Sequence, residues 1–414
     1  MPAQGSYSFL TRLRCSRCET RHDADVVQNL SPCCAAPLLA EYDLEQVRAH
    51  VSPAAIGDRA QTLWRYHELL PVRDSKYVNG FGEGMTPLIP LARLGARIGV
   101  PGLLVKDEGP LPTGSFKARG AAVGVARAAE LGVKSLAMPT NGNAGAAWAA
   151  YCARVGIQST IAMPSDAPAI TRSESVFAGA DVTLVDGLIS DAGRMVGELV
   201  AAGGVFDAST LKEPYRIEGK KTMGLEIVEQ LGWRVPDVIV YPTGGGVGLI
   251  GIYKAIRELQ SLGWIGADLP RLVSVQAEGC DPIVQAFNDG AQDITAQQDT
   301  RTAAFGINVP SPLGGRLVLE AVRATGGTAL SVSDDDLLQF IGTCAQDEGL
   351  LCCPEGAATL AAVAALRSSG WIAPADEVVV LNTGAGNKYA EAIAVELPTI
   401  ARDASLLRPA SAGG

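Results

Sequence analysis

A lysine stands in an unusual setting at the start of a predicted helix. Lys117 follows Phe116 in the run Pro112-Thr-Gly-Ser-Phe-Lys, and small apolar residues fill positions 121–126. Burial and the positive N-terminal end of a helix both favour the neutral amine, so they lower the pKa of a lysine. A neutral amine attacks carbonyl carbons. Lys117 is therefore a candidate for Schiff-base chemistry, although most lysines are solvated surface charges.

Three further segments carry polar or glycine-rich loops, each directly after a predicted strand. Backbone amides at the start of a helix can cradle a carboxylate or a phosphate. Taken singly, each loop can also be an ordinary turn with a capping side chain. The three segments are Thr140-Asn141-Gly-Asn143-Ala-Gly145, Gly244-Gly245-Gly246-Val247-Gly248 and Thr383-Gly-Ala-Gly386.

Together with Lys117, and in this order, the three segments meet the needs of one cofactor. Pyridoxal phosphate (PLP) requires a lysine for its aldehyde, a partner for its ring hydroxyl, a cradle for its phosphate and a partner for its ring nitrogen. Lys117, the asparagine loop, the glycine loop and Thr383 offer these groups. The set therefore predicts a PLP-dependent enzyme.

The glycine loop also fits a dinucleotide-binding pattern. Gly246-Val-Gly248-Leu-Ile-Gly251 spells GxGxxG, and Glu278, after the next predicted strand, is the acidic residue that a ribose would need. A lone GxGxxG is weak evidence in a chain with 47 glycines. From the residues alone, a nicotinamide-dependent oxidoreductase stays an alternative.

The elements that must position these residues alternate between strand and helix from about residue 85. Such alternation predicts a mostly parallel sheet with helices on both faces, and ligands of such sheets bind beyond the C-terminal ends of the strands. The polar loops fall at those ends. Strands are expected at 103–105, 136–138, 157–163, 182–185, 237–241, 272–276 and 377–381, and helices at 116–131, 144–155, 189–202, 222–231, 335–347 and 357–366.

Four motifs resemble the threonine synthase branch of the fold-type II PLP enzymes. The similarity covers roughly residues 80–395. The motifs are Gly82-Glu-Gly-Met-Thr-Pro-Leu, Val105-Lys-Asp-Glu, Pro112-Thr-Gly-Ser-Phe-Lys117 and Tyr215-Arg-Ile-Glu-Gly-Lys-Lys-Thr222-Met-Gly-Leu-Glu-Ile.

The resemblance implies an α/β fold of two open, mostly parallel αβα subdomains with the active site between them. The chain then divides into a cysteine-rich extension at 1–75, a first subdomain at 76–215 with Lys117 and the asparagine loop, a second subdomain at 216–400 with the glycine loop and Thr383, and a tail at 401–414. Within the extension, residues 51–76 are expected to form a helical connector.

The resemblance also implies roles for individual residues. Lys117 is the cofactor lysine and the proton carrier, Asn143 contacts the ring hydroxyl, and Thr383 faces the ring nitrogen. The cofactor phosphate is expected on Gly244, Gly245, Gly246, Val247 and Gly248. The candidates for substrate contacts are Ser115, Thr140, Asn141, Arg216 and Lys220, with Lys106 and Arg119 as further cations.

The implied reaction converts O-phospho-L-homoserine and water to L-threonine and phosphate. Departures from the family pattern bear on the substrate: Ala118 where many relatives carry Asp, Ala144 where Thr is frequent, and Glu213 where Asn is usual. The GGGVG loop looks more like that of threonine and serine dehydratases. The alternative is therefore a threonine or serine ammonia-lyase, or a β-replacing relative such as a cysteate or cysteine synthase.

Four cysteines near the N-terminus have spacing that suits a metal site. Cys15 and Cys18 form a CxxC pair, and Cys33 and Cys34 follow after 14 residues. This arrangement resembles the zinc-ribbon-like leader of some threonine synthases, with His22 as an alternative fourth ligand. The second pair is not CxxC. The other interpretation is therefore a former zinc-binding turn, a vestigial zinc knuckle, that no longer binds metal.

Bulk properties limit the partners. The formal net charge of −10 disfavours nucleic acid, and no apolar stretch reaches the roughly 18 residues that a membrane span needs. The first ten residues lack a signal pattern, so the nine cysteines are expected as reduced thiols in the cytoplasm. The expected partner is a small amino-acid substrate, and the resemblance implies a homodimer.

Overall fold

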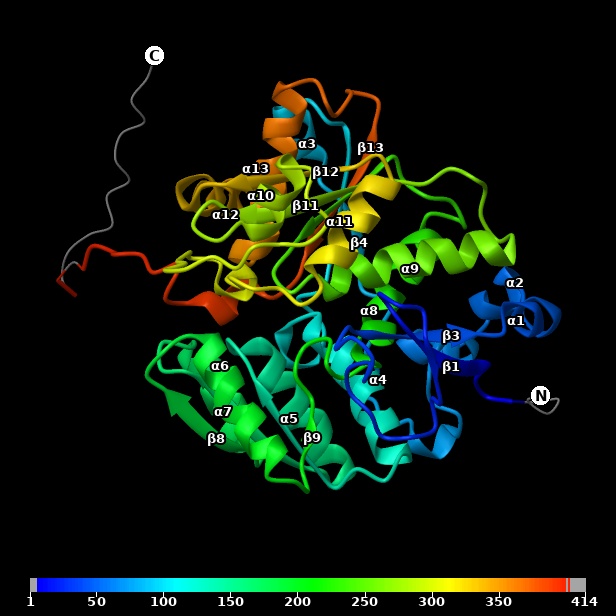
Figure 1. The fold of residues 1–414 in the computed structure, drawn as a ribbon. Coiled ribbons are helices and arrows are strands. Elements are labelled where there is room, and N and C mark those ends of the chain that lie inside the picture. Colours follow the sequence, from blue (N-terminus) through cyan, green and yellow to red (C-terminus); the bar gives the residue numbers. More distant parts are fainter. Residues whose placement is uncertain (1–5, 400, 403–414) are drawn as a thin grey trace, which may run out of the picture.

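Two open sheets make up most of the molecule, and a small antiparallel sheet lies beside them (Figure 1). The computed structural model describes residues 6–399 and 401–402. Most of the predicted tail at 401–414 therefore lies outside the described residues, as do residues 1–5 and 400. The α/β architecture with two open sheets confirms the expected fold class.

The larger sheet has the strand order β12-β11-β10-β13-β5-β4, and all neighbours are parallel except β4 and β5. Its strands are continuous apolar runs because both faces are covered. Val238 and Val240 of β10 belong to one apolar cluster, and Ile239 and Tyr241 to the other. The strands are β4 (Leu88–Pro90), β5 (Gly102–Asp107), β10 (Val238–Pro242), β11 (Arg271–Ala277), β12 (Thr328–Val332) and β13 (Glu377–Asn382).

Helices cover both faces of this sheet. One cluster contains residues of α3 (Ala92–Ile98), α12 (Asp334–Glu348) and α13 (Pro354–Ser368). The opposite cluster contains residues of α8 (Arg216–Gln230), α9 (Val247–Leu262), α10 (Pro282–Asn288) and α11 (Gly315–Ala324). This is the doubly covered sheet that the alternating pattern predicted.

The smaller sheet is fully parallel, with the order β8-β7-β6-β9. Apolar residues of α4 (Lys117–Glu130) and α5 (Asn143–Val155) fill one face, and α7 (Ile189–Ala201) covers the other. The remaining elements are β6 (Ser135–Pro139), β7 (Gln158–Pro164), β8 (Asp181–Val185), β9 (Phe206–Asp207) and α6 (Ala169–Phe177).

The chain path corrects one part of the predicted division. The boundary at residue 76 assigns β4, α3 and β5 to the first subdomain, but β5 pairs with β13 in the larger sheet, Val105 opposite Val380. Val105 and Leu103 are both about 1% exposed. An apolar strand of this kind is best buried between two neighbours in a covered sheet, so residues 88–107 belong with the second unit.

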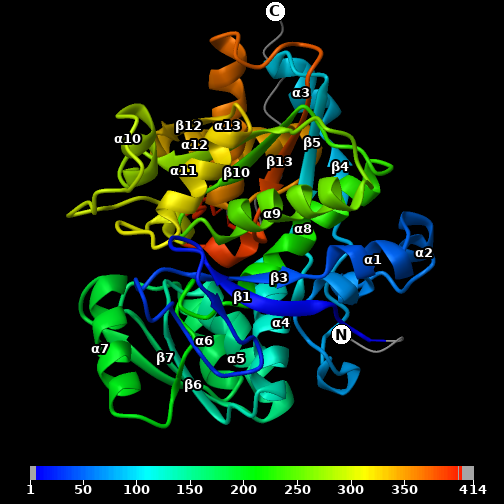
Figure 2. The same cartoon turned by 45° about the vertical axis from the view of Figure 1, so that its right-hand side comes forward.

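The N-terminal extension begins with an antiparallel sheet of order β2-β1-β3. Figure 2 shows this sheet packed over α4 and α8. The elements are β1 (Leu10–Cys15), β2 (Arg21–His22), β3 (Leu38–Tyr42) and α1 (Leu44–His50).

The expected helical connector at 51–76 is not one helix. It consists of α2 (Pro53–Gly57), η1 (Leu63–Leu69) and η2 (Ser75–Tyr77), where η denotes a short 3-10 helix. Glycine weakens a helix and proline ends one, and Gly57 and Pro71 stand at these breaks. No helix of the described chain is both long and apolar enough to cross a membrane.

Candidate active site

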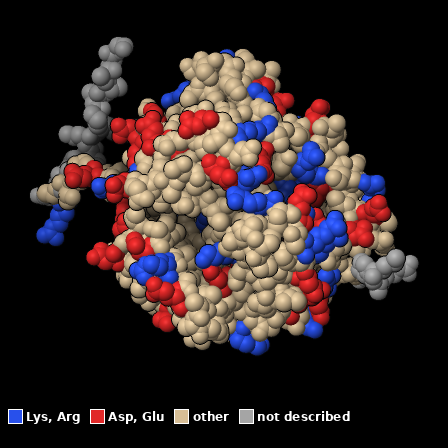
Figure 3. All heavy atoms as spheres, viewed as in Figure 1, with Lys and Arg blue, Asp and Glu red and all other residues tan. Residues whose placement is uncertain are grey.

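A cavity of about 280 Å³ lies between the two open sheets. The C-terminal ends of β6, β10 and β13 and the N-terminal ends of α4, α5, α9 and α13 meet there, where ligands of such sheets bind. On the face drawn in Figure 3, acidic and basic side chains are interspersed and the surface is hollowed between the two halves. The predicted residues on the wall are Lys117, Thr140, Asn141, Asn143, Arg216, Lys220, Gly244, Gly245, Gly246, Val247, Gly248 and Thr383.

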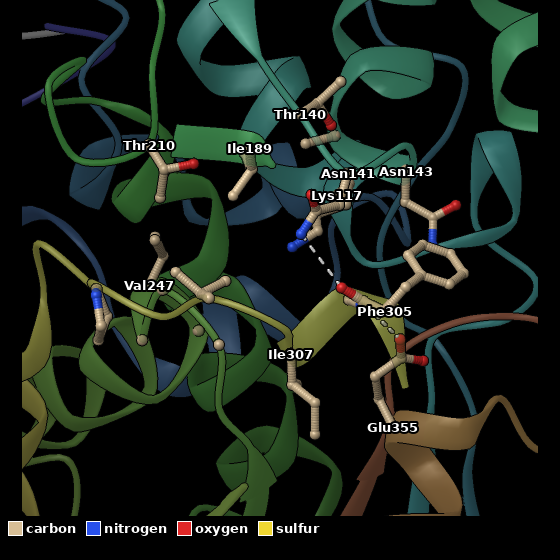
Figure 4. Close-up of a pocket in the computed structure, with 18 of the residues that line it drawn as sticks. Lys117, Thr140, Asn141, Asn143, Ile189, Thr210, Val247, Phe305, Ile307 and Glu355 are labelled. Atoms are coloured by element: carbon tan, nitrogen blue, oxygen red, sulfur yellow. Dashed lines mark hydrogen bonds between the residues drawn. The ribbon is translucent and has the colours of Figure 1, made fainter. Parts of the chain in front are cut away.

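Lys117 is the first residue of α4 and points into the cavity (Figure 4). Thr113 and Gly114 precede it with φ of +60° and +62°, a reversal that delivers the helix start to the cavity wall. Burial and, to a smaller extent, the positive charge of Arg216 lower the pKa of the Lys117 amine to about 8, although Glu355 acts in the opposite direction. A large fraction of this amine is therefore neutral near pH 8.

The glycine loop joins β10 to α9 and has little room for side chains. Gly246 has a φ of +82°, and a Cβ there would lie 2.4 Å from Val318 Cγ2. A Cβ on Gly248 would lie 1.8 Å from the Tyr241 hydroxyl oxygen. The backbone at Gly244–Gly248 thus lines the cavity directly, at the positive N-terminal end of a helix of 16 residues. This is a fitting cradle for a phosphate.

The asparagine loop is held by its own side chains and by the opposite unit. Thr140 Oγ1 accepts hydrogen bonds from the amides of Gly142 at 2.9 Å and Gly145 at 3.1 Å, so its hydroxyl shapes the loop. Asn141 Nδ2 donates to the backbone oxygen of Asn308 at 3.0 Å. Asn143 is buried, and its Oδ1 has no hydrogen-bond partner among the described residues. An unpaired buried amide oxygen at a cavity wall is suited to a polar ligand.

Thr383 directly follows β13 and is buried at the end of the cavity nearest Cys353. Its hydroxyl oxygen lies 3.7 Å from Cys353 Sγ, and its backbone oxygen accepts a hydrogen bond from the Phe116 amide at 3.0 Å. This bond ties the end of β13 to the residue before Lys117. The two predicted cofactor contacts therefore share one rigid wall.

The predicted cations divide into two groups. Arg216 and Lys220 line the cavity. Arg216 donates to Thr210 Oγ1 at 3.1 Å, and its guanidinium stands 4.6 Å from the Trp148 ring centroid. These contacts fix the guanidinium before any ligand arrives.

The two further cations, Lys106 and Arg119, lie away from the cavity wall, contrary to expectation. Lys106 Nζ contacts Glu226 at 2.8 Å, and Arg119 Nη2 contacts the same carboxylate at 2.7 Å, with all three side chains fully buried. Buried charges require partners, and these have found them inside the protein. Ser115 is also buried beside the cavity and is bridged through its backbone to Gly384.

Sequence reasoning missed several residues of the cavity. Glu355 is the second residue of α13 and Tyr389 ends η5 (Gly386–Tyr389). A loop at 305–313, which begins with η4 (Phe305–Ile307), closes one side. The run Cys353-Pro-Glu-Gly, a cap followed by proline at a helix start, was an available signal for Glu355.

The four N-terminal cysteines come together at the turns of the small sheet. The Sγ atoms of Cys15, Cys18, Cys33 and Cys34 all lie within 4.8 Å of one another. His22 is not part of this group; its Nε2 lies 3.1 Å from Ser31 Oγ, which in turn lies 2.9 Å from Cys33 Sγ. The sequence left two interpretations, a metal site or a vestigial zinc knuckle without metal. The close grouping of the four sulfur atoms fits a metal site better.

The extension reaches the segment that carries Arg216. Asn29 Nδ2 donates to the backbone oxygens of Asp207 at 2.7 Å and Lys212 at 3.2 Å. Tyr215 Oη donates to the Ala24 oxygen at 2.6 Å. The cysteine cluster thus lies outside the cavity, but the extension supports one of its walls.

Comparison with known proteins identifies the family of the chain. The profile of the family described as pyridoxal-phosphate dependent enzyme matches residues 80–384. The threonine synthase of Methanocaldococcus jannaschii is 35% identical over 92% of this chain and 93% of its own length. The threonine synthase of Methanosarcina acetivorans is 36% identical over 90% of this chain and 91% of its own length.

Solved structures share the fold at lower identity. Threonine deaminase isoform 2 from Solanum lycopersicum superposes with a TM-score of 0.62 and 21% identity, over 75% of this chain and 88% of that one. Maize serine racemase gives a TM-score of 0.63 and 24% identity, over 73% and 88%.

The family profile spans the segments from the start of the larger sheet to Thr383, and the two archaeal relatives match nearly the whole chain. The chain therefore belongs to the pyridoxal-phosphate-dependent enzymes and, within them, to the threonine synthase family.

Proposed function

We propose that the protein is a PLP-dependent threonine synthase, which converts O-phospho-L-homoserine and water to L-threonine and phosphate. One observation carries this proposal beyond family membership. The cavity contains two kinds of anion site, the glycine cradle at Gly244–Gly248 and the cations Arg216 and Lys220. A reaction that holds a cofactor phosphate and a substrate phosphate together needs both.

The residues present fit the cofactor. Lys117 would hold its aldehyde, Gly244–Gly248 its phosphate, Asn143 its ring hydroxyl and Thr383 its ring nitrogen. The unpaired Oδ1 of Asn143 and the open glycine backbone support these roles. When bound, PLP withdraws electrons from the substrate carbon next to the amino group and so makes that carbon acidic.

The protein's own groups then have separate tasks. Lys117, once released as an amine, takes and returns protons, for which a pKa of about 8 is suitable. Arg216 and Lys220 orient the substrate phosphate and stabilise it as it leaves. Ser115, Thr140 and Asn141 were the other proposed substrate contacts. The hydrogen bonds of Thr140 and Asn141 support an indirect role, in which they shape the loop that receives the substrate carboxylate.

The proposal is tested by product analysis. The purified holoenzyme is given O-phosphohomoserine, threonine or serine in separate reactions, and phosphate, threonine and ammonia are measured. We expect equal amounts of phosphate and threonine from O-phosphohomoserine. Ammonia from threonine or serine, with O-phosphohomoserine left intact, would replace this function with that of an ammonia-lyase.

We further propose that Cys15, Cys18, Cys33 and Cys34 bind a structural zinc ion. The clustering of four sulfur atoms within 4.8 Å supports it, because Zn²⁺ prefers a tetrahedral set of thiolates. Metal analysis of protein purified without chelators tests this proposal, with one zinc per chain as the expected result.

We also propose a cytoplasmic homodimer. None of the nine cysteines, which all lie in the described part of the chain, forms a disulfide, and this supports a reducing compartment. Exposed apolar residues near the edge strand β8, among them Val176 at 55%, Phe177 at 92% and Leu184 at 46%, support a covered face. Sedimentation of the purified protein tests the dimer, and a monomer at all concentrations would contradict it.

A further inference from the structure

Glu355 is a buried acid in a cavity whose other charged groups are cations. It is 2% exposed, and it is the one carboxylate among the described residues that line the cavity. Its Oε1 accepts a hydrogen bond from the Gly306 amide at 2.7 Å. Its position at the start of α13 also stabilises a negative charge. We expect a carboxylate in a site for anionic ligands to have a specific hydrogen-bond donor as its partner.

The second oxygen of Glu355 has no partner. Oε2 is buried and accepts no hydrogen bond from any described residue. A carboxylate oxygen left unpaired inside a protein is costly, so a donor is expected to use it when the site is complete. In Figure 4, Glu355 and Lys117 enter the cavity from opposite sides.

Tyr389 lines the same cavity as Glu355 and is the candidate for that donor. Its hydroxyl oxygen accepts a hydrogen bond from Asn143 Nδ2 at 3.1 Å, which leaves its own proton free. Its ring stacks on Phe305, with 4.8 Å between the ring centroids. Burial and the negative charge of Glu355 raise the pKa of the Tyr389 hydroxyl well above its usual value, so it stays protonated.

We propose that Glu355 is a positioning residue of the cofactor site, which anchors Tyr389, and through Tyr389 the amide of Asn143, and supplies the negative charge that faces Lys117. This proposal depends on the proposed role of Lys117 as the cofactor lysine. Asn143 is then held with its remaining polar groups toward the cofactor ring, and the nitrogen of Lys117 keeps its proton to a higher pH than the cations around it would allow.

Several other charged or titratable groups face this part of the cavity, and a pH titration reports their sum. The charge of Arg216 lowers the pKa of Lys117, while burial and the charges of Lys117 and Arg216 lower the pKa of Lys220 on the same helix. Burial raises the pKa values of the Tyr241 and Cys353 groups, so both stay neutral in the physiological range. Glu213, 3.6 Å from Arg216, is a second buried acid near this wall, but Glu355 is the acid that raises the pKa of Lys117.

The test is a pH titration of the visible absorption of bound PLP in the holoenzyme. In Glu355→Gln, which removes the charge and keeps the size, we expect the transition to move to lower pH by roughly one unit. Glu355→Asp should restore the wild-type transition, because it restores the charge. Glu320→Gln, on an exposed acid of α11 that pairs with Arg316 at 2.9 Å, should titrate as wild type.

Tyr389→Phe separates the two parts of the proposal. It keeps the charge of Glu355 but removes the hydroxyl, so we expect an unchanged titration with weaker PLP affinity, measured by equilibrium dialysis. This variant also carries the test if Glu355→Gln does not fold. An unshifted titration in Glu355→Gln, or unchanged PLP affinity in Tyr389→Phe, would overturn the proposal. Failure of Lys117 itself to hold PLP in the wild-type protein would instead remove the proposed function.

Discussion

Lys117 and Lys220 place their ammonium nitrogens near the same ring, 4.3 Å and 4.1 Å from the centroid of Phe116. Lys220 also donates a hydrogen bond to the backbone oxygen of Phe116, which fixes it on the wall. Lys117 extends into the cavity (Figure 4). Burial lowers the pKa values of both amines. The cavity wall therefore contains two lysines, Lys117, which is partly buried, and Lys220, which is buried. They differ in that Lys220 is held by the Phe116 backbone oxygen.

The pKa of Lys117 predicts how the apoprotein takes up PLP. Only the neutral amine attacks the aldehyde, so the uptake rate should rise about tenfold per pH unit below pH 8 and level off above it. Stopped-flow absorption measures this rate, with N-acetyl-lysine as an ordinary amine for comparison. A rate that keeps rising toward pH 10.5, the usual lysine value, would contradict the shifted pKa.

A methyl group on Gly248 should disrupt the phosphate cradle. Its Cβ would meet the Tyr241 hydroxyl at 1.8 Å, so either the loop or the ring must move. We expect Gly248→Ala to weaken PLP binding by at least tenfold, measured by dialysis against free cofactor. Gly266→Ala is the matched control, because a Cβ there meets nothing within 4 Å. Equal PLP affinity in the two variants would mean that the phosphate binds elsewhere.

Arg216→Ala should strongly reduce the turnover of O-phosphohomoserine and leave the binding of PLP unchanged. Loss of a charged contact to the substrate phosphate is expected to lower kcat/KM by about 2–4 kcal/mol in transition-state free energy. The absorption of bound PLP should stay, because the cofactor phosphate has its own cradle.

The control for Arg216 is Arg154→Ala, an exposed arginine stacked at 4.6 Å on Phe81 outside the cavity. It should turn over as wild type. Arg216→Lys should not restore the rate, because lysine cannot reproduce the guanidinium contacts with Thr210 and Trp148. Full activity in Arg216→Ala would exclude this residue from the substrate site.

Cys18→Ser should release the bound metal and lower the unfolding temperature while the PLP absorption remains. Metal binding stabilises only the folded knuckle, so its loss lowers stability. Zinc content and thermal unfolding are measured on the same samples, with Ser16→Ala as the control within the knuckle. Loss of PLP absorption on metal removal would show that the extension supports the cofactor as well.

Much of the fold followed from local patterns. Short apolar runs that end at glycine or proline predicted most strands of both sheets. Such strands are buried on both faces, so their composition differs sharply from that of the loops around them. Glycine stops near residues 132, 156 and 203 gave the helix ends of the smaller unit. The order of the strands in the sheets could not be predicted from local patterns, because the pairing of β5 with β13 joins segments more than 270 residues apart.

The site was predictable where function constrains the backbone. Lys117, Gly244–Gly248 and Thr383 were predicted to share one site and do line one cavity, because each lies between a strand and a helix in a run of distinctive residues. Tyr389 was missed because a single tyrosine carries no signal until the fold brings it to Asn143, and Glu355 was missed although Cys353-Pro-Glu-Gly signals a helix start. Lys106 and Arg119 were misplaced for the same reason, because their partner Glu226 comes more than 100 residues later.

Borohydride reduction of the holoenzyme, followed by peptide mass spectrometry, tests the central claim most directly. Reduction fixes PLP on the lysine that holds it. The account predicts loss of the visible absorption and one modified peptide, with the cofactor mass on Lys117. Modification of Lys220 instead, or a colourless protein that binds a nicotinamide dinucleotide at Gly246–Gly251, would contradict it.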